Sequence, residues 1–416
     1  MSQEKIKIKE LASLFERNRF EQIKQALGTG DVRRVRELAM AVRAEYLPVH
    51  DGFRDAAALT LAYLCETYGL EKGEAMGREC IEKAMPGGDP PQYAQADFGD
   101  RVRTIAFGWH WHASRFRLTE DDEKVTFHLL PCGSGMRLIQ EGYYKKGPFG
   151  PPEVGLAGEG RVPRSKLPSK SNFMTKDFPA YCHHCSEMGH ISLKNGISTF
   201  IVEGWTPLRS QGMCLQHTFK DTSLVPDEFY RRADLPIPHT RDKAKVDKRF
   251  FSPGELHEIE THPLDRLVDR GEKGDINGAL ESVEECLVGW RDSIHDVYCL
   301  WPPLLWCEVH QGFGYEALVN VVRATAPEIF AHIRGANYLE WAAFWSIHLR
   351  LRRIEQRGQS IEFTVGPESI FVPNVLPHDF SWYVDRLNEG IEKRGWKDLG
   401  DFEVKNKNLV HRLPLK

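Results

Sequence analysis

The order of segments in the first third of the chain recurs after residue 262, and this repeat constrains the fold more than any local pattern. A stretch that begins at Gly30-Asp31 has a counterpart that begins at Gly274-Asp275. The intervals within the trio His112, Phe127 and Pro131 are also the intervals within the trio His348, Phe363 and Pro367. Duplicated units commonly pack as pseudo-symmetric pairs. We therefore expect two pseudo-repeated units packed together.

Each copy is predicted to run from helices into a strand. From about residue 8 to 115, apolar residues recur at intervals of three and four, which is the helical period. Residues 124–131 (KVTFHLLP) alternate instead, as a strand with one buried side does, and IEFTV does the same in the second copy. Another strand is expected at 198–203. The predicted fold class is α+β.

The first copy carries an insert that the second lacks. Residues 143–180 are rich in Gly, Pro, Lys and Ser, which predicts a long surface excursion. The Cys/His-containing part of the insert follows it, and a charged, Pro-containing linker is expected at 231–262. The predicted domains are 1–230, the first repeat with its insert, and 263–416, a second repeat without chemistry.

Size and charge limit the class of protein. With 416 residues, 41% of them hydrophobic, the chain should bury two cores. A net charge of -4 provides no global attraction for nucleic acid or an anionic membrane, so we expect neither partner. The N-terminal residues lack the apolar stretch of a signal peptide, and no segment is apolar enough to span a membrane. We expect a cytoplasmic protein with a small-molecule substrate. The Trp-rich stretch 300–306 is expected to belong to the core or to a contact in a homo-oligomer.

The chain has nine cysteines, an odd number that suits a reducing compartment better than a disulfide framework. Five of them stand among apolar residues in helical patterns, where a buried thiol packs as a small hydrophobe: Cys65, Cys80, Cys286, Cys299 and Cys307. The other four have a different setting.

Those four cysteines predict a metal site. The segment YCHHCSEMG holds Cys182 and Cys185 at a CxxC spacing, with His184 between them. Two more thiols are Cys214, in GMCLQHTF, and Cys132, in PCGSG. Thiolate and imidazole ligands suit zinc or another transition metal. The predicted ligands therefore come from three segments that only tertiary folding would unite.

The chemistry of the site stays open at this point. A closed zinc site would fasten the insert to the sheet, whereas a catalytic zinc would keep one position for water. An iron–sulfur centre is disfavoured because the clustered ferredoxin spacings are absent. Without metal, Cys132 or Cys182 could act as a nucleophile beside a histidine. The catalytic candidates are Cys132 and the acid/base groups Glu187, His217 and Asp221.

Two smaller patterns have both a functional and a structural interpretation. The glycines of PCGSG (131–135) could form an anion-binding nest beside the thiol of Cys132, or simply a tight turn after the strand. His50-Asp51 and His295-Asp296 fit helix starts, where the aspartate would act as a cap. We favour the structural interpretation in both cases.

The segments LTEDDEKVTFHLLPCGSG, YCHHCSEMGH and GMCLQHTFKD together resemble the L-2-amino-thiazoline-4-carboxylate hydrolase-like proteins. The resemblance covers about residues 30–230 and does not extend to the Gly/Pro-rich insert or the second half. It implies hydrolysis of a carbon–nitrogen bond in a heterocycle. We accordingly expect a metal-assisted hydrolase or lyase that acts on a small polar compound, with a non-catalytic protein carrying a structural zinc as the alternative.

Overall fold

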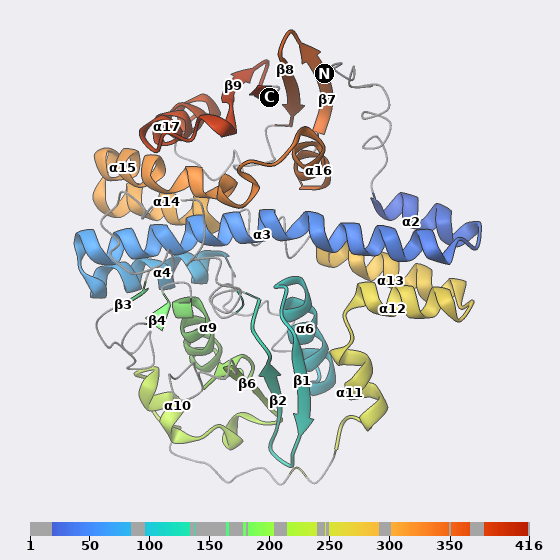
Figure 1. Cartoon of the computed structure of the whole chain (residues 1–416). Coiled ribbons are helices and arrows are strands. Elements are labelled where there is room, and N and C mark those ends of the chain that lie inside the picture. Colours follow the sequence, from blue (N-terminus) through green and yellow to red (C-terminus); the bar gives the residue numbers. More distant parts are fainter. Residues whose placement is uncertain are drawn as a thin grey trace. The chain divides into compact units, whose positions relative to one another are not determined.

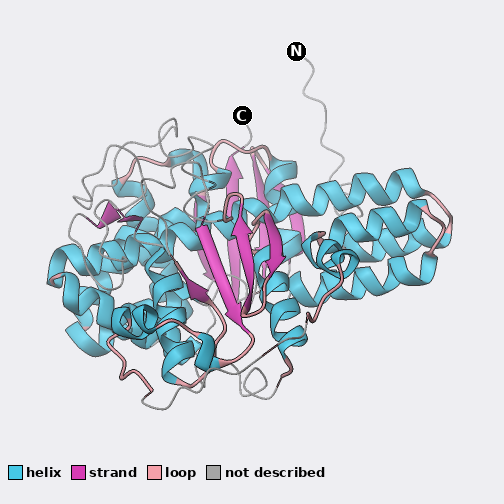
Figure 2. Cartoon of the chain, turned by 90° about the horizontal axis from the view of Figure 1, so that it is seen from below, coloured by secondary structure: helices cyan, strands magenta, loops and turns pink. Residues whose placement is uncertain are grey.

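The computed structural model describes residues 19–84, 96–133, 137, 164–165, 178–179, 182–203, 214–238, 246, 249–290, 301–348, 351–366 and 378–414. Helices account for most of these residues, while the strands form two four-stranded antiparallel sheets and a two-stranded one (Figure 2). The fold is α+β, as the sequence predicts. Most of the Gly/Pro-rich segment 143–180 lies outside the described residues, as do His295, Asp296 and Cys299.

The chain divides into two compact units. Unit 1 comprises Met1–Ala57 and Pro263–Lys416, and unit 2 comprises Ala58–His262. The boundary at residue 262 coincides with the end of the segment expected as a linker. The N-terminal residues, however, group with the C-terminal part of the chain rather than with the rest of the first repeat.

Unit 1 begins with two helical hairpins that lie side by side (Figure 1). One is α2 (Arg19–Gly28) with the first part of α3 (Val32–Tyr68), and the other is α12 (Pro263–Glu272) with α13 (Ile276–Val288). The ring of Trp290 meets Phe20 and Tyr46 edge-on, at centroid distances of 5.7 and 5.9 Å. Burial of these aromatic rings, rather than the exposed ion pairs around them, holds the hairpins together.

The rest of unit 1 consists of helices and a four-stranded sheet, and α16 and α17 pack against the strands. The helices are α14 (Trp301–Phe313), α15 (Tyr315–Thr325), η6 (Ala326–Ile333), α16 (Tyr338–His348), α17 (Phe380–Lys393) and η8 (Lys397–Leu399). The strands are β7 (Leu351–Arg357), β8 (Ser360–Val365), β9 (Asp401–Lys405) and β10 (Asn408–Pro414).

His50 and Asp51 lie inside α3, so the prediction of a helix start at this pair was wrong. Both side chains are buried, and His50 Nδ1 lies 2.8 Å from Asp51 Oδ1. One turn later Asp55 pairs with Arg54 and with His332 of η6, whose Nε2 is 2.6 Å away. The charges of this stretch are compensated inside unit 1, which lets the helix continue through a polar and proline-containing segment.

Unit 2 builds its own sheet and the helices around it. The helices are the second part of α3, α4 (Leu70–Ala84), α6 (Phe98–Trp111), α9 (His183–Lys194), η4 (Thr222–Leu224), α10 (Asp227–Arg232) and α11 (Pro253–Glu260). The strands are β1 (Phe116–Glu120), β2 (Lys124–Leu129), β5 (Ile201–Val202) and β6 (Cys214–Phe219), with the short pair β3 (Arg164–Ser165) and β4 (Phe178–Pro179). Val125, Phe127 and Leu129 alternate along β2 and pack into one core with residues of α6, as the strand pattern predicts.

The two four-stranded sheets share one topology. Their orders are β1-β2-β6-β5 and β7-β8-β10-β9, so each runs first, second, fourth, third in chain order. A helix precedes each sheet, α6 or α16, and another stands between its second and third strands, α9 or α17.

In each unit, an equivalent buried hydrogen bond joins the helix that precedes the sheet to one of the strands. The indole Nε1 of Trp109 donates to Gln216 Oε1 at 3.1 Å, and that of Trp345 donates to His411 Nδ1 at 3.0 Å. Gln216 stands opposite Phe127 in its sheet, and His411 stands opposite Phe363. Position for position, therefore, His411 corresponds to Gln216.

Helix α9 and helix α17 also end in the same way. Each is followed by a glycine with positive φ, Gly196 at 70° and Gly395 at 64°. In both, the next residue donates its N–H back into the last turn, Ile197 to the carbonyl of Ser192 and Trp396 to that of Ile391. This is the Schellman arrangement, for which glycine suits the left-handed position. The two helices therefore share one C-terminal motif.

The correspondence of His411 with Gln216 gives a prediction about how the stability of unit 1 depends on pH. His411 is fully buried, which lowers its pKa from 6.5 to about 4. Nε2 donates to the Leu399 carbonyl, so Nδ1 must stay unprotonated to accept from Trp345. The pKa of His411 is lower in the folded protein than in the unfolded chain. Its contribution to the free energy of unfolding is therefore complete above about pH 6.5 and is lost as the pH falls toward 4. The loss amounts to about 3 kcal/mol.

Urea unfolding followed by tryptophan fluorescence, at about pH 7 and about pH 4.5, measures this loss. The variant His411→Gln copies the residue that unit 2 uses, so it should keep the bond to Trp345 and lose less stability on acidification than wild type. Equal losses in the two proteins would contradict the assignment.

Within the described ranges, no helix has both the length and the apolar composition that crossing a membrane requires.

Candidate functional site

Two of the four predicted cysteine ligands lie at one end of the unit 2 sheet. β2 and β6 are antiparallel, and Cys214, the first residue of β6, stands opposite Leu129, the last residue of β2. Cys132 follows β2 by three residues. The side chain of Cys214 faces the same side of the sheet as Gln216, because alternate residues of a strand share a face. That side is the one covered by α6, since Trp109 bonds Gln216.

The turn that carries Cys132 is held tightly against the end of α6. The N–H of Gly133 donates to Ser114 Oγ at 2.8 Å. A Cβ on Gly133 would lie 1.3 Å from the carbonyl oxygen of His112, so no larger residue fits. The Gly133 N–H already has a partner within the protein, which favours a packed turn over an anion-binding nest at this part of PCGSG. Ser134 and Gly135 lie outside the described residues.

The CxxC pair occupies the beginning of α9. Cys182 is the N-cap residue and Cys185 lies in the first turn. His184 is buried beside them, with its Nε2 3.2 Å from the sulfur of Cys185 and its ring centroid 6.1 Å from that of His112. A helix N-terminus favours negative charge, which suits thiolates at this position.

The four thiols share one neighbourhood. The pKa of Cys185 is raised well above its usual range, first by burial and then by the thiols of Cys182, Cys214 and Cys132. Cys132 belongs to the core beneath the sheet, and Cys185 and Cys214 pack against that same core. Ionised together without a cation, such thiols would repel one another in a medium of low dielectric.

Within the described part of the chain, no three His, Cys, Asp or Glu side chains are already arranged around one point as ligands of an ion. All eight cysteines in these ranges are free thiols. The sulfurs are therefore gathered but not bonded to one another.

The fold itself does not require the cysteines. Counted from the glycine that ends each helix, Cys185 corresponds to Val384 in α17. Counted from the strand residue that accepts the indole N–H, Cys214 corresponds to Leu409 in β10. Val384 and Leu409 are both buried, so the same architecture in unit 1 is completed by aliphatic side chains.

His217 and Asp221 are placed away from the thiols. His217 is separated from Cys214 by three positions on β6, so it faces the opposite side of the sheet. There its Nδ1 lies 3.0 Å from Thr126 Oγ1 and its Nε2 lies 3.0 Å from Glu203 Oε1. Asp221 accepts the backbone N–H of Ser223 and so begins η4.

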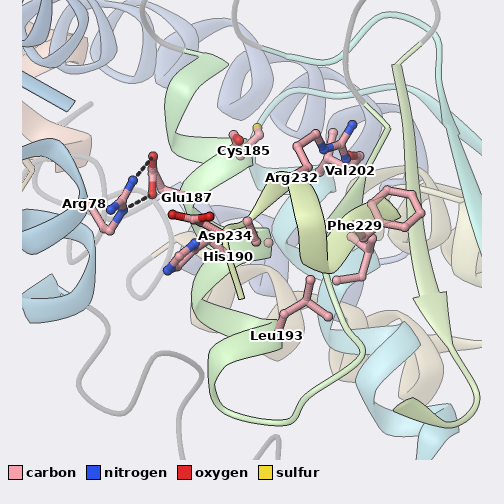
Figure 3. A pocket seen from close by; sticks show the side chains of 13 residues that line it. Arg78, Cys185, Glu187, His190, Leu193, Val202, Phe229, Arg232 and Asp234 are labelled. Carbon is pink, nitrogen blue, oxygen red and sulfur yellow. Dashed lines mark hydrogen bonds and ion pairs between the residues drawn. The ribbon is translucent and has the colours of Figure 1, made fainter. Parts of the chain in front are cut away.

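Glu187 is held by an ion pair between α4 and α9. Its carboxylate accepts from Nε of Arg78 at 2.5 Å and from Nη2 at 3.2 Å (Figure 3). Two further pairs join the same helices, His183 with Glu74 and Lys194 with Glu82. This ladder fixes α9 in position and with it both the CxxC thiols and Glu187.

A cavity of about 250 Å³ lies beside α9 (Figure 3). Its polar lining comes from Arg78, Cys185, Ser186, Glu187, His190, Arg232 and Asp234, and its apolar lining from Leu193, Ile201, Val202 and Phe229. Cys185 thus belongs both to the thiol neighbourhood and to the cavity wall. The cavity brings charged groups of both signs next to a thiol.

Several cavity residues carry no sequence pattern that would have revealed them. Arg232, at the end of α10, donates to the backbone carbonyls of Val202 at 2.5 Å and Glu203 at 3.3 Å, and its guanidinium lies over the ring of Phe229. Among the lining residues that the sequence analysis did not name, His190 had a signal: it stands three residues after Glu187 and therefore on a neighbouring part of the same helix face.

No protein-family model, curated protein or solved structure matches the chain.

Proposed function

We propose that unit 2 is a metal-assisted hydrolase or lyase that acts on a carbon–nitrogen bond of a small polar, heterocyclic compound. The observation that carries this proposal is the convergence of thiols from three segments on Cys185, which also lines a polar cavity. The resemblance of the cysteine-bearing segments to L-2-amino-thiazoline-4-carboxylate hydrolase-like proteins is what suggests the bond and the heterocycle.

Zinc is the metal that this donor set suits best. Cys182, His184, Cys185 and Cys214 would supply three or four ligands, and Cys132 would be either a further ligand or a nucleophile. Sulfur and imidazole donors in a tetrahedral sphere are typical of zinc, and a bound metal would offset the repulsion between neighbouring thiolates. Free thiols at the site also fit the reducing cytoplasm, where we place the protein.

An open coordination position is what hydrolysis would require. Zinc with three protein ligands lowers the pKa of a bound water to about 7 and so supplies hydroxide at neutral pH. Of the acid/base candidates from the sequence, Glu187 lines the cavity, although Arg78 holds its carboxylate. His217 lies across the sheet from the thiols and receives no role at the cavity in this proposal.

The alternative is a closed, purely structural zinc site. The packing of Cys185 and Cys214 against the core favours it, because a saturated sphere at that place would fasten α9 to the sheet. The protein would then be non-catalytic, and its duplicated helices would present a binding surface.

Protein purified without chelators is expected to contain about one equivalent of a transition metal per chain. Elemental analysis measures the content. Substitution with cobalt(II) then separates the two versions, because the visible spectrum of an open site should respond to added azide whereas that of a closed Cys/His sphere should not. Metal-free protein whose thermal stability is unchanged by added zinc would contradict both.

A further inference from the structure

The cavity beside α9 contains one histidine whose surroundings suit proton transfer. His190 projects from the third turn of α9 and lines the cavity together with Cys185 and Glu187 (Figure 3). No other described histidine belongs to the cavity lining; His217, for example, meets Thr126 and Glu203, and His183 meets Glu74. Among the described residues, His190 is therefore the histidine that the cavity offers to a ligand.

Ala233, the residue that ends α10, lines the cavity together with His190. A backbone hydrogen bond to Ala233 raises the pKa of His190, which is the effect of a ring N–H that donates to a carbonyl. The chain turns sharply there, because Asp234 has a φ of 58° and Leu235 donates its N–H back to Tyr230. A histidine that donates through one nitrogen presents the other as an acceptor while the ring is neutral. The second ring nitrogen is then the one that can accept a proton.

Burial and the positive charges around His190 favour the neutral ring, in which one nitrogen is an acceptor. Its pKa is lowered first by burial and then by Arg78 of α4, with a smaller contribution from Lys194 of α9. Glu187 and the bond to Ala233 oppose the shift, and Asp234 and Arg232 face the same cavity. The ring is consequently neutral at neutral pH, the state in which it can accept a proton.

We propose that His190 is the general base of this cavity, which deepens the proposed hydrolase function and rests on it. The acceptor nitrogen takes a proton from water, the water oxygen forms a bond to the substrate carbon, and the carbon–nitrogen bond breaks. The proton then passes from His190 to the departing nitrogen. One water is consumed, and the histidine returns to its neutral form.

The probe for this role is p-nitrophenyl acetate, whose nitrophenolate leaves without protonation and so isolates the base step. Wild type should show a kcat/KM that is constant above the pKa of His190 and falls below it. His190→Gln retains an N–H donor but no base, so it should lower the plateau of kcat/KM about 100-fold or more and displace the acid limb of the pH profile toward the pKa of the metal-bound water. His190→Ala should behave alike.

His128→Ala is the matched control. His128 also has a pKa lowered by burial, but it lies on β2, where its Nε2 meets Thr119 Oγ1, and it is not part of the cavity lining. Its rate and pH profile should match wild type. Circular dichroism and metal content, measured for every variant, verify that fold and metal are retained.

The outcomes separate this inference from the proposed function. If His190→Gln keeps its metal and matches wild type in rate and pH profile, His190 is not the base, although the metal hydrolase can stand. A wild type that is no faster than His190→Gln at any pH overturns the inference as well, with or without bound metal. A lower plateau rate together with a displaced acid limb, at unchanged metal content, supports it.

Discussion

Replacement of Cys185 with serine is expected to remove the metal that we propose for unit 2. The other three thiols contribute to the raised pKa of Cys185, and His184 contacts its sulfur. Serine keeps nearly the same volume, but its neutral oxygen is a poor ligand for a soft metal. Because the free energy of binding a structural metal is also free energy of folding, on the order of 10 kcal/mol for zinc in small domains, the variant should melt at a clearly lower temperature.

Metal content and thermal melting, recorded on the same preparations, measure both effects. Cys65→Ser is the matched control: this thiol is also partly buried in unit 2, and its pKa is raised to about 12, mainly by burial. It should keep its metal. A Cys185→Ser variant that retains a full equivalent of metal would show that Cys185 is not a ligand.

Cys132→Ser distinguishes the two roles open to Cys132. Loss of metal identifies a ligand, whereas loss of activity at unchanged metal content identifies a nucleophile or a general acid.

Substitution of Gly133 by alanine is expected to destabilise unit 2 by about 3 kcal/mol or more. The added methyl would lie 1.3 Å from the carbonyl oxygen of His112 and 2.6 Å from the carbonyl carbon of Ala113. Both atoms belong to backbone, so no side-chain rotation relieves the clash. The turn must move away from α6, and the bond from the Gly133 N–H to Ser114 must lengthen.

Urea unfolding of unit 2 is the measurement, and Gly108→Ala is its control. Gly108 lies on the exposed side of α6, and nothing comes within 4 Å of the position its Cβ would take. Alanine there should stabilise the helix by about 0.5–1 kcal/mol. If Gly133→Ala is as stable as wild type, the close approach of the turn to α6 does not occur in solution.

The sequence predicts those parts of the fold that depend on periodicity. The alternation of Val125, Phe127 and Leu129 predicts β2 because one side of that strand is buried, and three- and four-residue spacing predicts the helices before it. The prediction of a helix start at His50-Asp51 was wrong. Both side chains are buried among compensating charges, and α3 therefore continues through residues that often stand at the start of a helix.

The site is predicted less completely, and for a specific reason. The three-residue separation of Cys214 and His217 would place the predicted ligand and the predicted acid/base group at one site only if GMCLQHTF is not a strand. In β6 that separation sends the two side chains to opposite faces. The lining contributed by Arg78 and Arg232 depends on how α4 and α10 pack against α9, and no local pattern encodes such contacts.

The division of the chain into units has a consequence for biosynthesis. Unit 2 is one unbroken stretch, whereas unit 1 joins residues from both sides of it. Ribosomes add about 5–20 residues per second, so α2 and the first part of α3 emerge on the order of ten seconds or more before α12 and α13. During that interval the nascent hairpin exposes Phe20, Ile23 and Leu27, which the finished unit buries. A chain stalled near residue 262 would thus hold all of unit 2 together with an uncovered helical hairpin, a natural substrate for chaperones.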